Sequence, residues 1–128
     1  MTVEYALTLP VVRGDPVLLG HAIFNLIQNA IKYTPPGGQI MIRVYQKNYG
    51  GKPKIAFEVQ DNGVGIPLAQ QEKLFEPFYR VQQAGIEDIP GKGLGLSVVR
   101  AAVEHHKGRV YVDSAPGEGS LFGFWVPV

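Results

Sequence analysis

The long run of residues 15–33 has the spacing of an amphipathic helix. Its apolar residues recur at three- and four-residue steps, so they share one face of a helix. They are Leu19, Ile23, Leu26, Ile27 and Ala30. Asp15 is a favourable N-cap, Pro16 suits the first helical position, and the Thr-Pro-Pro-Gly-Gly segment at 34–38 ends the pattern. The sequence therefore predicts one helix over residues 15–33.

Period-two alternation of apolar and polar residues predicts strands on both sides of this helix. The predicted strands cover residues 3–9, 39–46, 54–60, 109–114 and 120–126. A stretch rich in Gly and Lys at 47–53 predicts the loop of a hairpin, and the Gly and Pro residues at 115–119 predict a second connection.

Two further helices are predicted in the second half of the chain. Residues 68–74 suit a short helix, and residues 94–107 suit a longer one that stops at Gly108. The face predicted for the longer helix comprises Leu94, Val98, Ala101, Ala102 and His105. Residues 75–90 have no steady period and predict a long loop, and loops of that length in compact domains are usually lids or binding loops.

This order of elements predicts an α/β fold with two layers. Strands that follow one another as hairpins outnumber strand–helix–strand crossovers, which favours a mixed, largely antiparallel sheet with helices on one face. A chain of 128 residues with 45% hydrophobic residues fits one domain over residues 1–128.

Charge and composition exclude several classes of function. A formal net charge of +1 gives no electrostatic basis for binding nucleic acid or an anionic membrane surface. The chain has no cysteine, so disulfides, thiolate metal sites and a cysteine nucleophile are excluded, and no apolar run approaches the roughly 20 residues of a membrane span. None of the three histidines has metal-ligand spacing, and we interpret His105 and His106 as structural residues at a helix end.

The predicted helix over 15–33 has an unusual polar face. His21, Asn25, Asn29, Lys32 and Tyr33 line up there. Asn has a lower helix propensity than Ala, because its carboxamide competes for backbone hydrogen bonds. This face suits either a ligand-binding surface or a solvated polar patch, and the helix alone favours neither.

Two glycine clusters could line a pocket. In Asp-Asn-Gly-Val-Gly at 61–65, the glycines allow close backbone approach, and Asp61 could accept from an exocyclic amine such as that of adenine; the alternative is a plain Asp-Asn-Gly turn. Gly-Lys-Gly-Leu-Gly-Leu at 91–96 opens a predicted helix and suits a phosphate, or else a glycine-rich helix entry without ligand. A P-loop is excluded because Lys92 is followed by Gly93, and a dinucleotide fingerprint because no strand precedes the cluster.

Two further segments carry weaker signals. In Phe-Glu-Pro-Phe-Tyr-Arg at 75–80, Phe75 and Phe78 suit core anchors, and Arg80 is a candidate phosphate clamp. Gly-Glu-Gly-Ser at 117–120 favours a hairpin turn, with a pocket-lining role as the second interpretation.

Taken in order, these segments and the Asn-Leu-Ile-Gln-Asn-Ala-Ile-Lys-Tyr-Thr stretch at 25–34 resemble the N, G1, F, G2 and G3 boxes of sensor histidine kinases, which belong to the GHKL ATPase superfamily. The resemblance covers almost the whole chain. It implies the Bergerat ATP-binding fold, ATP and Mg²⁺ as ligands, and an ATP lid over about residues 66–90.

The resemblance also implies roles for individual residues. Asp61 would bind the adenine amino group, Asn29 would ligate Mg²⁺, and Asn25, Lys32 and Tyr33 would face the phosphates and ribose. The implied catalytic residues are Asn25, Asn29, Lys32 and Arg80. The implied nucleotide contacts are Asn29, Lys32, Tyr33, Asp61, Gly63, Gly65, Ile66, Phe78, Arg80, Gly91, Lys92, Gly93, Leu94, Gly95, Leu96 and Ser120.

The residue type at the position of Asn25 distinguishes two kinds of activity within the superfamily. Gyrase-like and chaperone-like members have a water-activating Glu where this chain has Asn25, and a carboxamide is a very poor base. The resemblance therefore implies transfer of the γ-phosphoryl group to a protein and poor ATP hydrolysis. Neither His21 nor His105 fits the family's acceptor motif, so the acceptor His is expected on a separate dimerisation domain, with a response regulator as the next partner.

Three alternatives share the fold. They are a serine kinase of the anti-sigma-factor type, a nucleotide-binding regulatory pseudokinase, and an autonomous gyrase-like ATPase, which Asn25 disfavours. The resemblance implies a soluble cytoplasmic domain without direct membrane contact, cut from a kinase that can itself be membrane-anchored.

Overall fold

The computed structural model describes residues 2–5, 9, 12–76 and 95–128. Within these residues, five strands form one mixed sheet in the order β1-β2-β3-β5-β4. The strands are β1 Thr2–Tyr5, β2 Ile40–Tyr49, β3 Lys52–Asp61, β4 Arg109–Ser114 and β5 Ser120–Pro127. β1 pairs with β2 in parallel, and the other neighbouring pairs are antiparallel.

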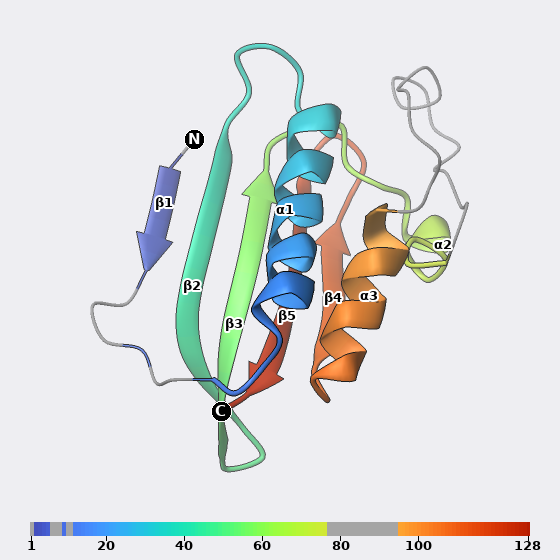
Figure 1. The fold of residues 1–128 in the computed structure, drawn as a ribbon. Coiled ribbons are helices and arrows are strands. Elements are labelled where there is room, and N and C mark those ends of the chain that lie inside the picture. The colour runs from blue at the N-terminus through green and yellow to red at the C-terminus, as the bar shows by residue number, and fades with distance from the viewer. Residues whose placement is uncertain (1, 6–8, 10–11, 77–94) are drawn as a thin grey trace.

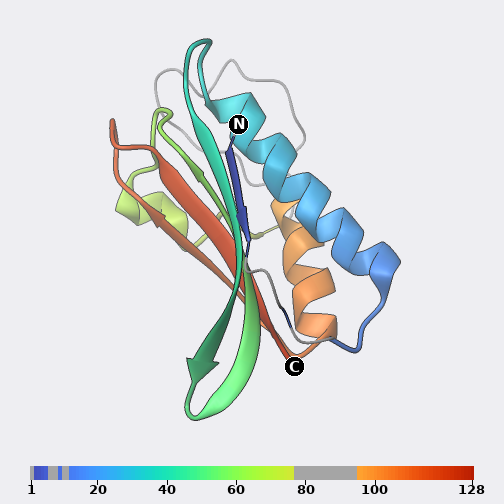
Figure 2. The ribbon, with the colours of Figure 1, turned by 90° about the vertical axis from the view of Figure 1, so that its left-hand side faces the viewer.

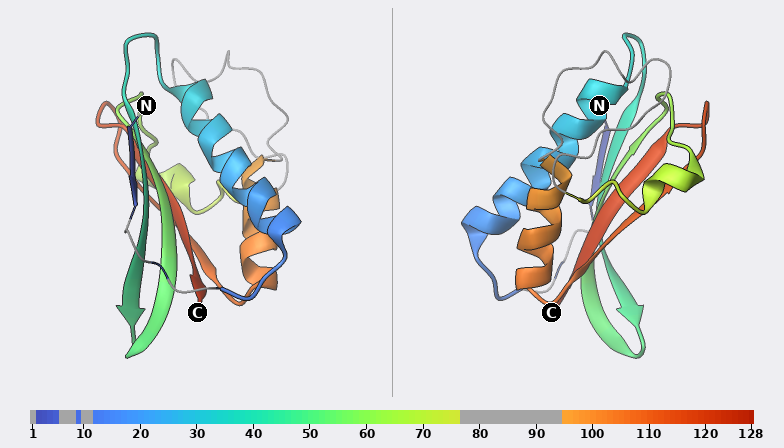
Figure 3. Two further views of the ribbon diagram at one scale, coloured as in Figure 1. Left: turned by 60° about the vertical axis from the view of Figure 1, so that its left-hand side comes forward. Right: turned by 90° about the vertical axis from the view of Figure 1, so that its right-hand side faces the viewer.

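Two helices cover one face of this sheet (Figures 1 and 2). α1 Pro16–Tyr33 and α3 Gly95–His105 lie side by side over the strands, as both views in Figure 3 show. The four-residue α2 Leu68–Gln71 lies near the end of β4 (Figure 1). The predicted two-layer α/β sandwich with a mixed, largely antiparallel sheet is confirmed.

The core lies between the helices and the sheet. The strands contribute apolar residues from alternate positions, because successive side chains of a strand point to opposite faces. They include Phe57, Val59, Phe122, Phe124 and Val126, and the helices add Ala22, Leu26, Ala30, Val99 and Val103. Leu26 is 1% exposed, and burying a leucine side chain this fully stabilises the fold by about 2 kcal/mol.

The start of α1 forms as the sequence predicts. The Oδ1 atom of Asp15 accepts hydrogen bonds from the backbone N–H groups of Val17 at 2.9 Å and Leu18 at 3.3 Å. These bonds satisfy donors that the helix itself leaves unpaired. At the other end the hydroxyl of Thr34 donates to the carbonyl of Ala30 at 2.7 Å, just before two prolines.

The loop predicted over residues 47–53 is wrong. β2 continues to Tyr49 and β3 begins at Lys52, so that only Gly50 and Gly51 connect the strands. Both glycines have positive φ, 57° and 77°. Two such residues make the tight turn whose twist matches a hairpin, and this turn lets the flanking Lys and Asn residues stay in the ladder.

The face predicted for α3 is also wrong in part. Val99, Ala102 and Val103 are buried, whereas Val98 is 41% exposed and His105 is exposed. α3 packs against both α1 and the β4–β5 side of the sheet, and the residues directed at this junction are the buried ones. Because α3 is mostly apolar, the spacing of its apolar residues in the sequence does not specify which face is buried.

Three predicted boundaries differ from the structure. β1 ends at Tyr5, and Leu9, where the predicted strand ends, has no regular structure. α2 ends at Gln71, and turns continue through Leu74. α3 ends at His105, whereas the predicted helix ends at Lys107; the first residue of the predicted helix, Leu94, lies outside the described residues.

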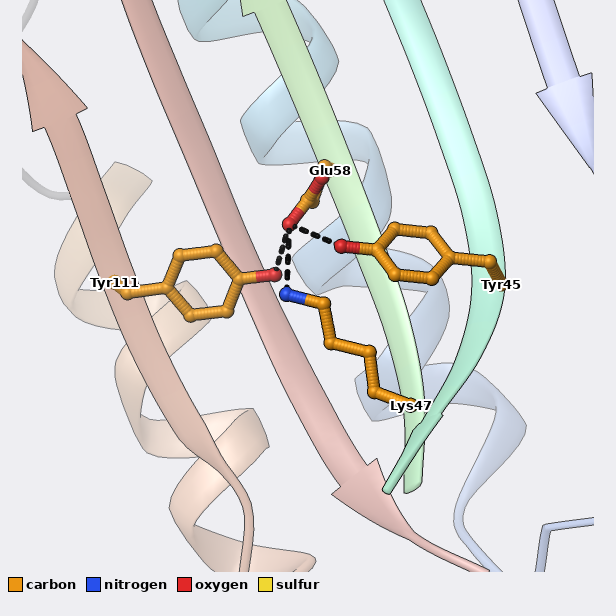
Figure 4. Close-up of polar contacts among 4 residues, drawn as sticks. All are labelled: Tyr45, Lys47, Glu58 and Tyr111. Carbon is orange, nitrogen blue, oxygen red and sulfur yellow. Dashed lines mark hydrogen bonds and ion pairs between the residues drawn. The ribbon is translucent and has the colours of Figure 1, made fainter. Parts of the chain in front are cut away.

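The sheet face away from α1 and α3 carries a buried carboxylate (Figure 4). Glu58 is 6% exposed, and its Oε2 atom accepts hydrogen bonds from the hydroxyls of Tyr45 at 2.8 Å and Tyr111 at 2.5 Å. The ammonium of Lys47 lies 3.6 Å from the same oxygen. Tyr111 lies over Gly123, where a β-carbon would come within 2.7 Å of the ring.

None of the helices in the described part of the chain is both long enough and apolar enough to cross a bilayer.

Candidate functional site

The predicted site segments meet at one end of the sheet. In Figure 1 the end of β3, the start of β5, the C-terminal end of α1 and the start of α3 lie toward the same upper end of the molecule. The loop after β3 and the connection between β4 and β5 also lie there. Segments far apart in the sequence are therefore neighbours at this end.

Asp61 is the acidic residue at the centre of this end. It is the last residue of β3, pairs with Ile40 and Ser120 in the sheet, and is 6% exposed. Its Oδ1 atom accepts a hydrogen bond from the backbone N–H of Gly63 at 2.9 Å. Burial raises the pKa of the Asp61 carboxyl, while backbone N–H groups of Gly63 and Ser120 act in the opposite direction.

The loop after Asp61 packs directly against the end of α1. A β-carbon at Gly63 would overlap the backbone carbonyl of Tyr33, so only glycine permits this approach. The Oδ1 atom of Asn62 accepts a hydrogen bond from the backbone N–H of Gln39 at 2.7 Å, and its own N–H donates to the carbonyl of Gln39 at 3.2 Å. These contacts hold the α1–β2 connection against the loop.

The β4–β5 connection packs on the other side of the same loop. A β-carbon at Gly65 would overlap the carbonyl of Ala115, and one at Gly119 would overlap the carbonyl of Asp61. The backbone N–H of Gly117 also donates to the carbonyl of Val64 at 2.8 Å. The 117–120 segment is therefore part of a strand connection that also packs against the loop of Asp61.

The polar face of α1 borders this end. The carboxamide of Asn25 is half-buried, its Nδ2 donates to the carbonyl of His21 at 2.8 Å, and a β-carbon at Gly95 would lie 3.3 Å from its Oδ1. Asn29 is half-buried, and its side chain makes no hydrogen bond within the described part of the chain. Lys32 is exposed.

Several predicted contacts also contribute to packing. Ile66 is buried in the core, while Tyr33 and Leu96 pack partly buried against it. Ser120 is 7% exposed, with its hydroxyl 2.7 Å from that of Ser114. Phe75 is buried edge-to-face against Phe122, with ring centroids 6.4 Å apart, which confirms it as a core anchor.

Six predicted site residues lie outside the described residues. They are Phe78, Arg80, Gly91, Lys92, Gly93 and Leu94. Most of the lid predicted at about residues 66–90 lies outside them as well.

The sequence did not point to Gln71 or Ser114, although both contact the loop of Asp61. Gln71 is 8% exposed and Ser114 ends β4. A buried glutamine is unusual, yet its burial here depends on a tertiary contact that no local pattern reveals. The described residues contain no group of three or more His, Asp or Glu side chains that could hold a metal ion by themselves.

Comparison with known proteins identifies the family. Residues 14–128 match the profile of the histidine kinase-, DNA gyrase B- and HSP90-like ATPases. The chain therefore belongs to this family of ATPases. It is an ATP-binding domain of the kind found in sensor histidine kinases, as its curated relatives and structural neighbours show.

Two curated relatives are sensory kinases of cyanobacteria. The adaptive-response sensory kinase SasA of Thermosynechococcus vestitus is 39% identical over 127 residues, which cover 99% of this chain and 32% of that protein. The circadian input-output histidine kinase CikA of Synechococcus elongatus is 36% identical over 117 residues, which cover 91% of this chain and 15% of that protein. The chain thus spans a third or less of these two relatives.

Solved structures of histidine kinases share the fold. The mycobacterial sensor histidine kinase MprB has a TM-score of 0.77 at 34% identity, over 98% of this chain and 81% of that one. The catalytic domain of histidine kinase ThkA has a TM-score of 0.78 at 30% identity, over 98% of this chain and 76% of that one. Full-length ShkA in complex with AMPPNP has a TM-score of 0.74 at 28% identity, over 98% of this chain and 25% of that one.

Proposed function

We propose that this domain binds Mg²⁺-ATP at the end of the sheet around Asp61 and transfers the γ-phosphoryl group to a histidine on a separate dimerisation domain. A response regulator would then receive the phosphoryl group. Two close approaches at this end of the sheet carry the proposal: the Asp61 loop packs on the end of α1 at Tyr33, and the start of α3 lies against Asn25 of the polar face of α1. The loop of Asp61 suits a nucleobase, and the polar face of α1 with the start of α3 suits phosphates.

Adenine recognition is assigned to Asp61. Its carboxylate lies at the end of a buried strand, and one oxygen is already fixed by the N–H of Gly63 at 2.9 Å. Because water is largely excluded, a hydrogen bond from the 6-amino group of adenine would have few competitors. The glycines at 63 and 65 let the loop beside Asp61 pack closely on the end of α1 and on the β4–β5 connection.

The phosphates are assigned to the polar face of α1 and the start of α3. Amide oxygens are suitable ligands for Mg²⁺, and the carboxamide of Asn29 has no other hydrogen bond within the described part of the chain. Bound Mg²⁺ would neutralise phosphate charge. Lys32 adds a cation on the same face, and Gly95 at the start of described α3 lies next to Asn25.

The identity of residue 25 favours phosphotransfer over hydrolysis. The carboxamide of Asn25 is neutral and donates to the carbonyl of His21 at 2.8 Å, so it cannot remove a proton from water. An imidazole nitrogen needs no such base, because its lone pair attacks the γ-phosphorus directly. The new N–P bond forms as the bond from phosphorus to the bridging oxygen breaks, and ADP leaves.

The proposed transfer can be tested with purified components. The domain is mixed with Mg²⁺ and γ-³²P-ATP, with and without the helical dimerisation domain of the full-length kinase, and the labelled product is treated with acid. We expect label on the dimerisation domain that acid removes and alkali retains. A dimerisation domain with its acceptor His changed to Ala should stay unlabelled, as should the wild-type acceptor mixed with the Asn29→Ala variant.

Each alternative function predicts a different result of the same assay. Acid-stable label on a partner would indicate a serine kinase, and ATP binding without any transfer would indicate a regulatory pseudokinase. Rapid release of phosphate without a partner would indicate a gyrase-like ATPase. The proposed reaction uses ATP and passes its phosphoryl group to a response regulator, and both requirements support a cytoplasmic location for the domain.

A further inference from the structure

The backbone of Ile66 is held on both sides by side chains from other segments. Its N–H donates to the hydroxyl of Ser114 at 2.8 Å, and its carbonyl accepts from Nε2 of Gln71 at 3.0 Å. Ile66 closes the loop that begins at Asp61, so these two bonds fix where the loop ends.

Gln71 connects this loop to the sheet. The same Nε2 group donates a second hydrogen bond, to the carbonyl of Ser114 at 2.7 Å. Gln71 is only 8% exposed. If its carboxamide were removed, the carbonyl groups of Ile66 and Ser114 would lose a donor, and little water could replace it. One carboxamide thus joins the end of the Asp61 loop to the end of β4.

Ser114 is itself fixed by the β4–β5 connection. Its hydroxyl oxygen lies 2.7 Å from the carbonyl oxygen of Gly119 and 2.7 Å from the hydroxyl of Ser120. The hydroxyl can donate to Gly119 while it accepts from Ile66 and Ser120, which uses its one hydrogen and both of its lone pairs. The network therefore has one preferred arrangement.

The loop of Asp61 is consequently anchored at both ends. Asp61 is held by its strand pairs Ile40 and Ser120, and Ile66 is held by Ser114 and Gln71. The loop between them carries the N–H that fixes the Asp61 carboxylate. Loosening one anchor should let the carboxylate and Gly63 move together, away from the position in which they meet the base.

We propose that Gln71 and Ser114 are positioning residues for adenine recognition. They do not touch the nucleotide themselves, but hold the Asp61 loop in the conformation that accepts the 6-amino group. This inference rests on the proposed function of Asp61. Selectivity for adenine over bases that lack the amino group would then depend on two residues outside the sequence boxes as well as on Asp61.

The experiment compares the affinities of ATP and ITP, which differ at position 6 of the base, where ITP has a carbonyl in place of the amino group. Dissociation constants are measured by calorimetry for the wild type and for Gln71→Met, Ser114→Ala and Ser114→Thr. Gln71→Met keeps the length of the side chain but removes its donors, and Ser114→Thr keeps the hydroxyl. All titrations are run well below each variant's unfolding temperature.

We expect Gln71→Met and Ser114→Ala to weaken ATP binding by about tenfold while ITP binding changes by less than about twofold. Ser114→Thr should keep the wild-type preference for ATP. A purely structural role would lower the unfolding temperature and leave the ATP/ITP ratio unchanged, and that result would overturn the inference while the role of Asp61 stands. A wild type that binds ATP and ITP equally would overturn both.

Discussion

The Nε2 atom of His106 accepts a hydrogen bond of 2.8 Å from the backbone N–H of Asp15, a residue 91 positions earlier in the chain. The other ring nitrogen, Nδ1, lies 2.8 Å from the carbonyl of Ala102 and must donate to it. These two bonds assign the ring hydrogen to Nδ1 and the accepting lone pair to Nε2. The imidazole joins the start of α1 to the end of α3, and Gly14 leaves room for the ring.

We predict that His106→Ala lowers the free energy of unfolding by about 1.5 kcal/mol, because the N–H of Asp15 loses its acceptor. The bond lies at the end of the helices away from the Asp61 loop, so the affinity for ATP should stay within about twofold of the wild type. Urea denaturation and calorimetry measure the two quantities. His105→Ala is the control, since His105 is exposed and contacts the ring of His106 only edge-to-face. Equal losses for both variants would contradict the assignment.

A second prediction concerns the buried carboxylate on the other face of the sheet. Burial raises the pKa of the Tyr45 hydroxyl, which remains a donor at neutral pH, as Glu58 requires. Glu58→Ala would remove the acceptor that two hydroxyls and the Lys47 ammonium share, and we expect it to cost about 2 kcal/mol of stability in urea denaturation.

Glu104→Ala is the control for the loss of a glutamate. Glu104 accepts from Arg100 at 2.9 Å, but both side chains are exposed. Removing this pair should leave the urea midpoint almost unchanged. If Glu58→Ala were no more destabilising than Glu104→Ala, the network in Figure 4 would contribute nothing to stability.

A third prediction separates backbone strain from close packing. Gly65 and Gly117 have similar positive φ angles, 74° and 78°, but a β-carbon would overlap Ala115 at Gly65 and meet open space at Gly117. We expect Gly117→Ala to cost about 1 kcal/mol from strain alone. Gly65→Ala should cost at least about 2 kcal/mol more and also weaken ATP binding, because it pushes the Asp61 loop off the β4–β5 connection. Equal costs would mean that the connection moves freely away.

A fourth prediction follows from the raised pKa of Asp61. The folded state holds this proton more tightly than the unfolded chain does, since burial raises the pKa above its ordinary value of 3.8. The corresponding stability is complete below that value and is lost as the pH rises through the folded pKa. In the nucleotide-free protein, the stability of the wild type relative to Asp61→Asn should therefore increase as the pH falls from about 7 to about 4. Parallel pH profiles in urea denaturation would contradict the shift.

Local chemistry made much of this fold predictable. α1 has a cap, a regular apolar spacing and a proline stop, and each of these signals involves only residues that are near one another in the sequence. The five segments that resemble kinase boxes are likewise short, and those in the described part of the chain lie at one end of the sheet. The class of protein and the candidate role of Asp61 therefore follow from the sequence.

Contacts between distant segments were not predictable. The bond of Ile66 to Ser114 spans 48 positions and that of Tyr111 to Glu58 spans 53, and a serine or a glutamate at a strand position is ordinary in itself. The buried face of α3 depends on where α1 lies. Gly50 and Gly51 are a local signal for a tight turn, but the polar residues around them resemble a longer loop.

Recognition of adenine by Asp61 is the central feature of the proposed site, and calorimetric titration with Mg²⁺-ATP tests it. The wild-type domain should bind one ATP per chain, and Asp61→Ala should weaken binding by about 100-fold or more, since it removes a buried, charged acceptor. Circular dichroism should show both proteins folded. An unchanged dissociation constant for folded Asp61→Ala would contradict the role of Asp61 in adenine recognition.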